Sequence, residues 1–155
     1  MRPEQAIRID NFMLKLSRKD YDALRKHGEE TYPYECCGIL LGHIDDEGTR
    51  VTTSIERAHN TRTDSPRNRY NIDPRDQIRI QREARQRGED VIGYYHSHPD
   101  HPAHWSITDL AEAHWPGLSY VITSVEKGKA ALTNSFELDS SDESRRFLDE
   151  TIEIA

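Results

Sequence analysis

The chain has 155 residues, is hydrophilic with a mean hydropathy of −0.90, and carries a formal net charge of −7. The negative charge argues against a nucleic-acid binder, and no apolar run reaches the roughly 20 residues needed to cross a bilayer. The beginning of the chain lacks the apolar core of a secretion signal, so the expected location is the cytoplasm. The length suits one domain over residues 1–155, with an acidic tail from about residue 140.

Strands are predicted by alternation, by apolar and β-branched residues, and by the turns that bound them. In chain order, the predicted strands are residues 7–16, 35–44, 50–58, 69–72, 91–97, 119–125 and 129–138. The run at 35–44 is mostly apolar, which predicts a strand buried on both faces. It is expected to form an antiparallel hairpin with 50–58, and 119–125 is expected to form another with 129–138.

Helix signals lie between these strands. Ser17 begins a capping box, and Pro33 ends the first helix. Asp73 is a good N-cap for the second helix, with Pro74 at its first position. A third helix is expected over about 106–114. The second helix has a thin apolar face, formed by Ile78, Ile80 and Ala84. A helix with so little apolar surface is expected to lie at the surface of the protein.

The acidic segment after Ser140 is also expected to be helical, docked through Phe147, Leu148 and Ile152. Strands and helices intermix along the whole chain, and the sequence contains no internal repeat. This arrangement predicts an α/β (α+β) fold, with a single mixed β-sheet flanked by helices.

The only cysteines are the neighbours Cys36 and Cys37, which cannot cross-link distant parts of a fold. Inside an apolar strand, both thiols are expected to be buried and reduced. Burial would raise their pKa values, so Cys37 is not expected to act as a nucleophile.

Two histidines end the strand predicted at 91–97. Because His96 and His98 are two residues apart, they project from the same face of a strand. Ser106 to Asp109 then begins a helix that can turn a carboxylate back toward the imidazoles. Two histidines and one aspartate leave a fourth position on zinc for water, as in catalytic zinc sites. This pattern predicts a metal-dependent hydrolase.

Each of these features also has a simpler explanation. In a chain with eight histidines, a His-x-His pair can arise by chance. Ser106 and Asp109 also match a capping box, whose acid lies near the positive end of the helix dipole. Glu35 is the candidate base, although an acid at a strand end is usually only solvated. His101 and His104 are expected to line the mouth of the site or to face solvent.

Taken together, the residues resemble the JAMM motif of the JAB1/MPN/Mov34 metallopeptidases, in particular the free-standing prokaryotic branch. The motif comprises Glu35 in YECCGILLG, the histidines of GYYHSHP and, after a gap of seven residues, Ser106 and Asp109. The resemblance covers about residues 10–138 and includes RYNIDP, before the second helix. It implies the JAB1/MPN fold, which is cytidine-deaminase-like.

The resemblance also implies a role for each residue. His96, His98 and Asp109 would hold one Zn²⁺ per chain, with water in the fourth position. Glu35 would take a proton from that water and pass it to the leaving amine, and Ser106 would donate a hydrogen bond to the oxyanion. The groups that hold the second nitrogen of each histidine ring are left open.

The substrate that the resemblance implies is a ubiquitin-fold protein, either a sulfur carrier of the thiamine or molybdopterin kind or a related modifier. The bond after its C-terminal glycine would be cleaved, in an isopeptide, a peptide extension or a cysteine adduct. Its extended tail would add to an exposed strand edge beside the metal. Two alternatives remain open: a metal-free binding scaffold of the same fold, and a zinc peptidase acting on small or cell-wall peptides. The oligomeric state is not indicated.

Overall fold

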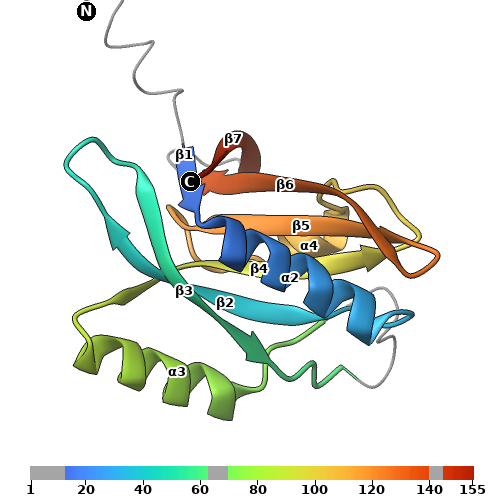
Figure 1. Cartoon of the computed structure of the whole chain (residues 1–155), viewed down its shortest axis with the longest axis horizontal. Coiled ribbons are helices and arrows are strands. Elements are labelled where there is room, and N and C mark those ends of the chain that lie inside the picture. Colours follow the sequence, from blue (N-terminus) through green and yellow to red (C-terminus); the bar gives the residue numbers. More distant parts are fainter. Residues whose placement is uncertain (1–12, 63–69, 140–144) are drawn as a thin grey trace, which may run out of the picture.

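The computed structural model describes residues 13–62, 70–139 and 145–155 (Figure 1). Within these ranges the helices are α2 Arg18–Thr31, α3 Pro74–Gln86 and α4 Ile107–Glu112, and the strands are β1 Met13–Leu16, β2 Cys37–Ile44, β3 Arg50–Ala58, β4 Asp90–Pro99, β5 Ser119–Glu126, β6 Lys129–Asp139 and β7 Arg146–Ile154. No helix in the described ranges has the length and apolar character needed to span a membrane.

The strands form one mixed sheet, as predicted, and the sheet closes into a barrel in the order β1-β3-β2-β4-β5-β6-β7. β2 is antiparallel to both β3 and β4, whereas β4 and β5 are parallel. A parallel pair needs a crossover connection, and residues 100–118, which include α4, supply it. β1 closes the barrel because it pairs with β3 on one side and with β7 on the other.

β2 is buried on both faces, as its apolar sequence predicts. Ile39 and Leu41 belong to one core cluster and Leu40 belongs to the other, because successive side chains of a strand point to opposite faces. Helix α3 contributes Ile80 to the first cluster, and α2 contributes Leu24 to the second. The two helices therefore cover opposite faces of the sheet around β2.

Helix α2 lies across the sheet and packs against β3, β4, β5 and β6 (Figure 1). Ser17 caps its N-terminus by accepting a hydrogen bond from the Asp20 amide at 3.0 Å. Gly28 allows a close approach, because an added Cβ would lie 3.0 Å from Val125 Cγ2 and 3.2 Å from Ser97 Cβ. The end of α2 is thus held against β4, the strand that carries the histidines.

The prediction for the acidic tail is wrong. Residues 146–154 form strand β7 rather than a helix, and residues 140–144 lie outside the described ranges. β7 pairs with β6 over 146–150 and with β1 over 151–154. Pairing satisfies backbone groups that β6 and β1 would otherwise leave without partners, and this gain outweighs the weak helical spacing of the tail's apolar residues.

Two smaller predictions also need correction. Residues 70–72 form no strand, since Ile72 makes only an isolated bridge with Asn60, and Arg69 lies outside the described ranges. On α3, Ile80 is buried but Ile78 is 56% exposed. Residues two positions apart in an α-helix are rotated by about 200° from one another around the helix axis. Ile78 and Ile80 therefore cannot share a face.

Candidate metal centre

His96 and His98 lie near the end of β4 and face the same side of the sheet, as the strand period predicts. Both are buried. Ser97, between them, points to the opposite face, where its Oγ accepts a hydrogen bond from the Cys36 amide at 2.9 Å. The pairing of β4 with β2 places Cys37 opposite His96. The backbone that carries both imidazoles is therefore fixed in position, because β4 is paired on both edges.

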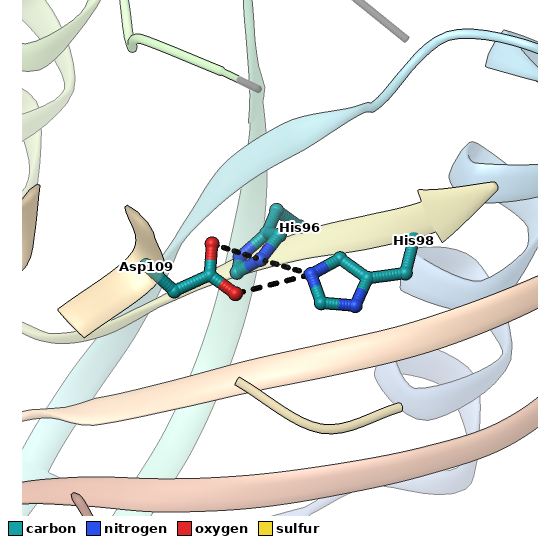
Figure 2. Close-up of side chains that lie close together, drawn as sticks. All are labelled: His96, His98 and Asp109. Atoms are coloured by element: carbon teal, nitrogen blue, oxygen red, sulfur yellow. Dashed lines mark hydrogen bonds and ion pairs between the residues drawn. The ribbon is translucent and has the colours of Figure 1, made fainter. Parts of the chain in front are cut away.

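Helix α4 brings Asp109 to these imidazoles. The Asp109 amide donates to Ser106 Oγ at 3.0 Å, and the Ser106 amide donates to Asp109 Oδ2 at 2.9 Å, which completes a capping box. Asp109 Oδ2 also lies 3.1 Å from His98 Nε2, and Oδ1 lies 3.3 Å from His96 Nε2 (Figure 2). The capping and metal-binding explanations are thus compatible, because the cap holds the carboxylate in the orientation that faces the histidines.

The spacing of the donor atoms fits zinc. His96 Nε2 and His98 Nε2 are 3.2 Å apart, close to the distances of each from the carboxylate. Two ligands bound to zinc at about 2.1 Å and at a tetrahedral angle lie about 3.4 Å from one another. Among the described residues, His96, His98 and Asp109 form the group whose donor atoms are close enough to share one ion. Two imidazoles and one carboxylate are a common donor set for zinc.

The protonation states of this group also suit a cation. Burial lowers the pKa of His96, although the Asp109 carboxylate opposes that shift. Burial would raise the pKa of Asp109, but the two histidines outweigh it and hold the pKa below its usual value. A neutral imidazole and an ionised carboxylate are the forms that bind a metal.

Glu35 lies two residues before β2 begins, rather than at the first strand position that the sequence predicted. Its side chain is 3% exposed, and Oε1 has no hydrogen-bond partner in the described part of the chain. Burial, together with the negative charges of Asp109 and Glu112, raises the pKa of this carboxyl to about 9. Buried carboxyl groups with such raised pKa values are concentrated at functional sites.

Glu35, His98 and Ser106 line a single pocket of about 470 Å³. The candidate base, one histidine and the candidate oxyanion donor therefore face one space. His101 and His104 are exposed and also line this pocket, as predicted.

A second pocket, of about 280 Å³, adjoins the other side of the centre at Asp109. Its walls include four aromatic side chains, Tyr70, Tyr94, Trp115 and Tyr120. Glu112 also lines it and is paired with Arg62 at 2.9 Å. No sequence pattern indicated this pocket, because its walls come from segments far apart in the chain.

The sequence also left open what holds each histidine ring. His98 Nδ1 lies 2.8 Å from the carbonyl oxygen of Pro102, so the Nδ1 proton is donated there and Nε2 is free to face Asp109. His96 Nδ1 is buried and has no partner in the described ranges. The ring of Tyr70 instead stacks on the His96 ring, with centroids 4.4 Å apart. A backbone carbonyl and a ring from a distant loop carry no recognisable sequence pattern.

Both cysteines are buried and unpaired with one another, as predicted. Burial raises the pKa of Cys36 to about 12 and raises the pKa of Cys37 well above its usual value. Neither thiol forms a thiolate near neutral pH, which confirms that they are packing residues rather than nucleophiles.

A closed mixed sheet, flanked by helices and carrying a His-x-His strand opposite a capped aspartate, defines a JAB-type domain. Comparison with known proteins identifies the family: the model for prokaryotic homologs of the JAB domain matches residues 17–139. The chain belongs to this family and to its free-standing prokaryotic branch.

Among characterised relatives, the desampylase of Haloferax volcanii is 34% identical over 115 residues, which cover 72% of this chain and 80% of that protein. The solution structure of a Desulfitobacterium hafniense protein has a TM-score of 0.76 at 28% identity and covers 92% of this chain and 94% of its own. A solution structure from Salinibacter ruber has a TM-score of 0.67 at 36% identity, covering 92% and 91%. These likenesses span the fold as well as the site.

Proposed function

We propose that this protein is a zinc-dependent peptidase or isopeptidase. It would hydrolyse the bond after the C-terminal glycine of a ubiquitin-like or sulfur-carrier protein, in an adduct or a precursor. The observation that carries this proposal is the convergence of three donor atoms of the kind that binds zinc, next to a pocket lined by Glu35, whose buried Oε1 has no hydrogen-bond partner among the described residues. Membership of the JAB family supports it.

Zinc held by His96, His98 and Asp109 would acidify a water molecule and polarise the scissile carbonyl. The protein's own part is then to move protons. Glu35 would accept the proton of the attacking water and return it to the leaving amine. Its Oε1 accepts no hydrogen bond from any described residue, so no interaction with those residues must break. In the metal-free protein, burial keeps this carboxyl protonated near neutral pH. The positive charge of a bound Zn²⁺ would lower its pKa, so that the carboxylate could accept the proton of the water and then pass it to the amine.

Ser106 would stabilise the oxyanion. Its Oγ accepts a hydrogen bond from the Asp109 amide, and a hydroxyl that accepts keeps its own proton to donate. The cap therefore holds the oxygen in place and leaves the donor available on the same pocket as Glu35. A donor held in position before the reaction is the arrangement that stabilises developing charge most effectively.

The substrate class rests on the relatives. The protein from Haloferax volcanii is named a desampylase, a name for an enzyme that removes a ubiquitin-like modifier. The pocket beside Glu35 and His98 adjoins the surface through exposed histidines, so an extended peptide tail can reach it from solvent. These observations favour a protein tail over a small molecule.

The test combines metal analysis with cleavage. Purified protein is expected to contain one zinc per chain and to cut a carrier protein fused through its C-terminal glycine to a reporter, with mass spectrometry placing the cut after that glycine. Chelation should abolish cleavage and added zinc should restore it. His96→Ala should fold but lose both zinc and cleavage.

Two results would overturn the proposal in different ways. A wild-type protein without stoichiometric zinc, and with unchanged partner binding in His96→Ala, would make it a scaffold. Zinc-dependent cleavage of short or cell-wall peptides, with the carrier fusion left intact, would keep the chemistry and reject the substrate.

A further inference from the structure

The two histidines of the candidate metal centre are held in different ways. His98 has a hydrogen bond from Nδ1 to the Pro102 carbonyl at 2.8 Å. His96 is more deeply buried, at 2% exposure, yet its Nδ1 has no partner in the described ranges. A hydrogen bond to the second ring nitrogen is the usual device that orients a metal-binding histidine. No described residue supplies such a hydrogen bond to His96.

Without it, the orientation of the His96 ring needs another cause. The torsion between the Cβ and Cγ atoms of histidine has broad, roughly two-fold minima. A half-turn about this bond exchanges Nδ1 with Cδ2 and Nε2 with Cε1, and would move Nε2 away from Asp109, from which it now lies 3.3 Å. For His98 the hydrogen bond to Pro102 opposes such a rotation. For His96, packing is what the described part of the chain offers to oppose it.

The ring of Tyr70 supplies this packing. It lies nearly parallel to the His96 ring, with an interplanar angle of 25° and centroids 4.4 Å apart. A flat ring at this distance blocks the rotation, because the imidazole would have to turn its edge into the neighbouring ring. Stacked aromatic pairs contribute beyond the area they bury.

We propose that Tyr70 is a positioning residue that orients His96 Nε2 toward the metal by stacking, in place of a hydrogen bond to Nδ1. The inference rests on the proposed zinc site and concerns the ring of Tyr70, not its hydroxyl. It gives a physical purpose to the segment before α3, which neither the metal ligands nor the candidate base explain.

The experiment measures zinc affinity by competition with a chromophoric chelator. Tyr70→Leu removes the ring and keeps an apolar side chain, and Tyr70→Phe keeps the ring without the hydroxyl. Trp115→Leu is the matched control, because Trp115 lines the same pocket and is 52% exposed. We expect Tyr70→Leu to bind zinc roughly 10-fold or more weakly, as for loss of other groups that orient metal ligands. Tyr70→Phe and Trp115→Leu should bind as the wild type does.

Cobalt substitution gives a second readout, since the visible absorption of Co²⁺ reports its coordination geometry. Among the variants, only Tyr70→Leu should have a changed spectrum. With chelator present to remove the metal, all the variants should unfold at similar denaturant concentrations. If the leucine variant does not fold, Tyr70→Met replaces it.

Equal zinc affinity and equal spectra for the wild type and the ring-free variant would overturn the proposal. So would a Tyr70→Phe variant as weak as Tyr70→Leu, because the hydroxyl would then be responsible. Wild-type zinc binding is measured first, so absence of a zinc site is distinguished from failure of this inference.

Discussion

Two groups of buried ionisable side chains lie at opposite ends of the β2–β3 hairpin. At one end, where Cys37 pairs with Ala58, the candidate metal centre includes a carboxyl oxygen and a ring nitrogen that have no hydrogen-bond partner in the described chain. At the other end, Arg50 pairs with Ile44 and lies between two acids. In the first group some polar atoms have no hydrogen-bond partner among the described residues, whereas in the second group the cation is paired with both acids.

The group around Arg50 satisfies its own charges. Arg50 Nη1 lies 2.7 Å from Glu150 Oε2, its Nε donates to the Gly117 carbonyl at 2.9 Å, and it also pairs with Glu137. Ser135 Oγ donates to the other oxygen of Glu150 at 2.6 Å. The guanidinium thereby joins β3 to β6 and β7, two strands with which β3 is not paired.

This difference distinguishes a cluster that stabilises the fold from a cluster that can bind a ligand and take part in a reaction. Buried polar groups are normally hydrogen-bonded, and an exception needs an explanation. Around Arg50 there is little left for a ligand to bind. Around Glu35 and His96, unpartnered atoms face converging donors, which is the arrangement expected where a metal, water and substrate complete the site.

The largest expected effect comes from Glu35→Gln. The amide cannot carry the proton of the attacking water, so kcat should fall about 10²- to 10⁴-fold, the usual range for a general base. Zinc content should not change, because Glu35 is outside the donor group. Cleavage assays on the carrier fusion, together with metal analysis, check both parts. A variant that cuts at the wild-type rate would show that Glu35 is not the base.

The same substitution should not weaken the fold. The pKa of Glu35 is raised from 4.5 to about 9, so the folded metal-free protein binds a proton that the unfolded chain releases above pH 4.5. The stability of the metal-free protein should therefore fall as pH rises from 4.5 toward 9. Glu35→Gln removes this dependence and should raise the free energy of unfolding by about 2–3 kcal/mol at pH 7. Denaturant unfolding at several pH values, with chelator present, measures it.

Arg50→Met should lower the free energy of unfolding, in contrast to Glu35→Gln, which should raise it. It leaves two buried carboxyl groups without their cation, which typically costs about 3–5 kcal/mol of stability. Zinc binding by the folded fraction should be unchanged. Arg57→Met is the matched control, because the Arg57–Glu30 pair is about half exposed and such pairs contribute about 1 kcal/mol or less. Equal losses in the two variants would show that the Arg50 cluster has no special structural role.

The smallest expected change in stability separates two roles of one serine. Ser17 and Ser106 both accept a hydrogen bond at 3.0 Å from an amide three residues ahead. Changing either to alanine should cost about 1 kcal/mol of stability through loss of the cap. Only Ser106→Ala should also reduce kcat, by up to about 10²- to 10³-fold if the hydroxyl stabilises the oxyanion. Full activity in Ser106→Ala would leave capping as its single role.

Local patterns predicted much of the site. The period of a strand is enough to place His96 and His98 on one face, and the Ser106-x-x-Asp109 pattern is enough to begin a helix with its acid near the cap. The hairpin of β5 and β6 and the burial of β2 on both faces were also predicted correctly. These features depend on neighbours within a few residues, whose geometry the backbone limits to a few forms.

The tail shows where such reasoning stops. Phe147 and Leu148 are compatible with a helix or a strand, and the choice depended on the edge of β6, the preceding strand, and on the edge of β1, which lies near the other end of the sequence. Glu150 looks like a solvated acid in the sequence and is instead buried against Arg50.

The amino-acid sequence by itself determined the ligand types, their local geometry and the resemblance to the JAB family. Only the tertiary structure decided that the sheet closes through β7, that Pro102 orients His98, and that Tyr70 stacks on His96. The physical reason is that local backbone geometry restricts short segments, whereas contacts between distant segments depend on which unsatisfied groups and apolar surfaces the whole chain brings together.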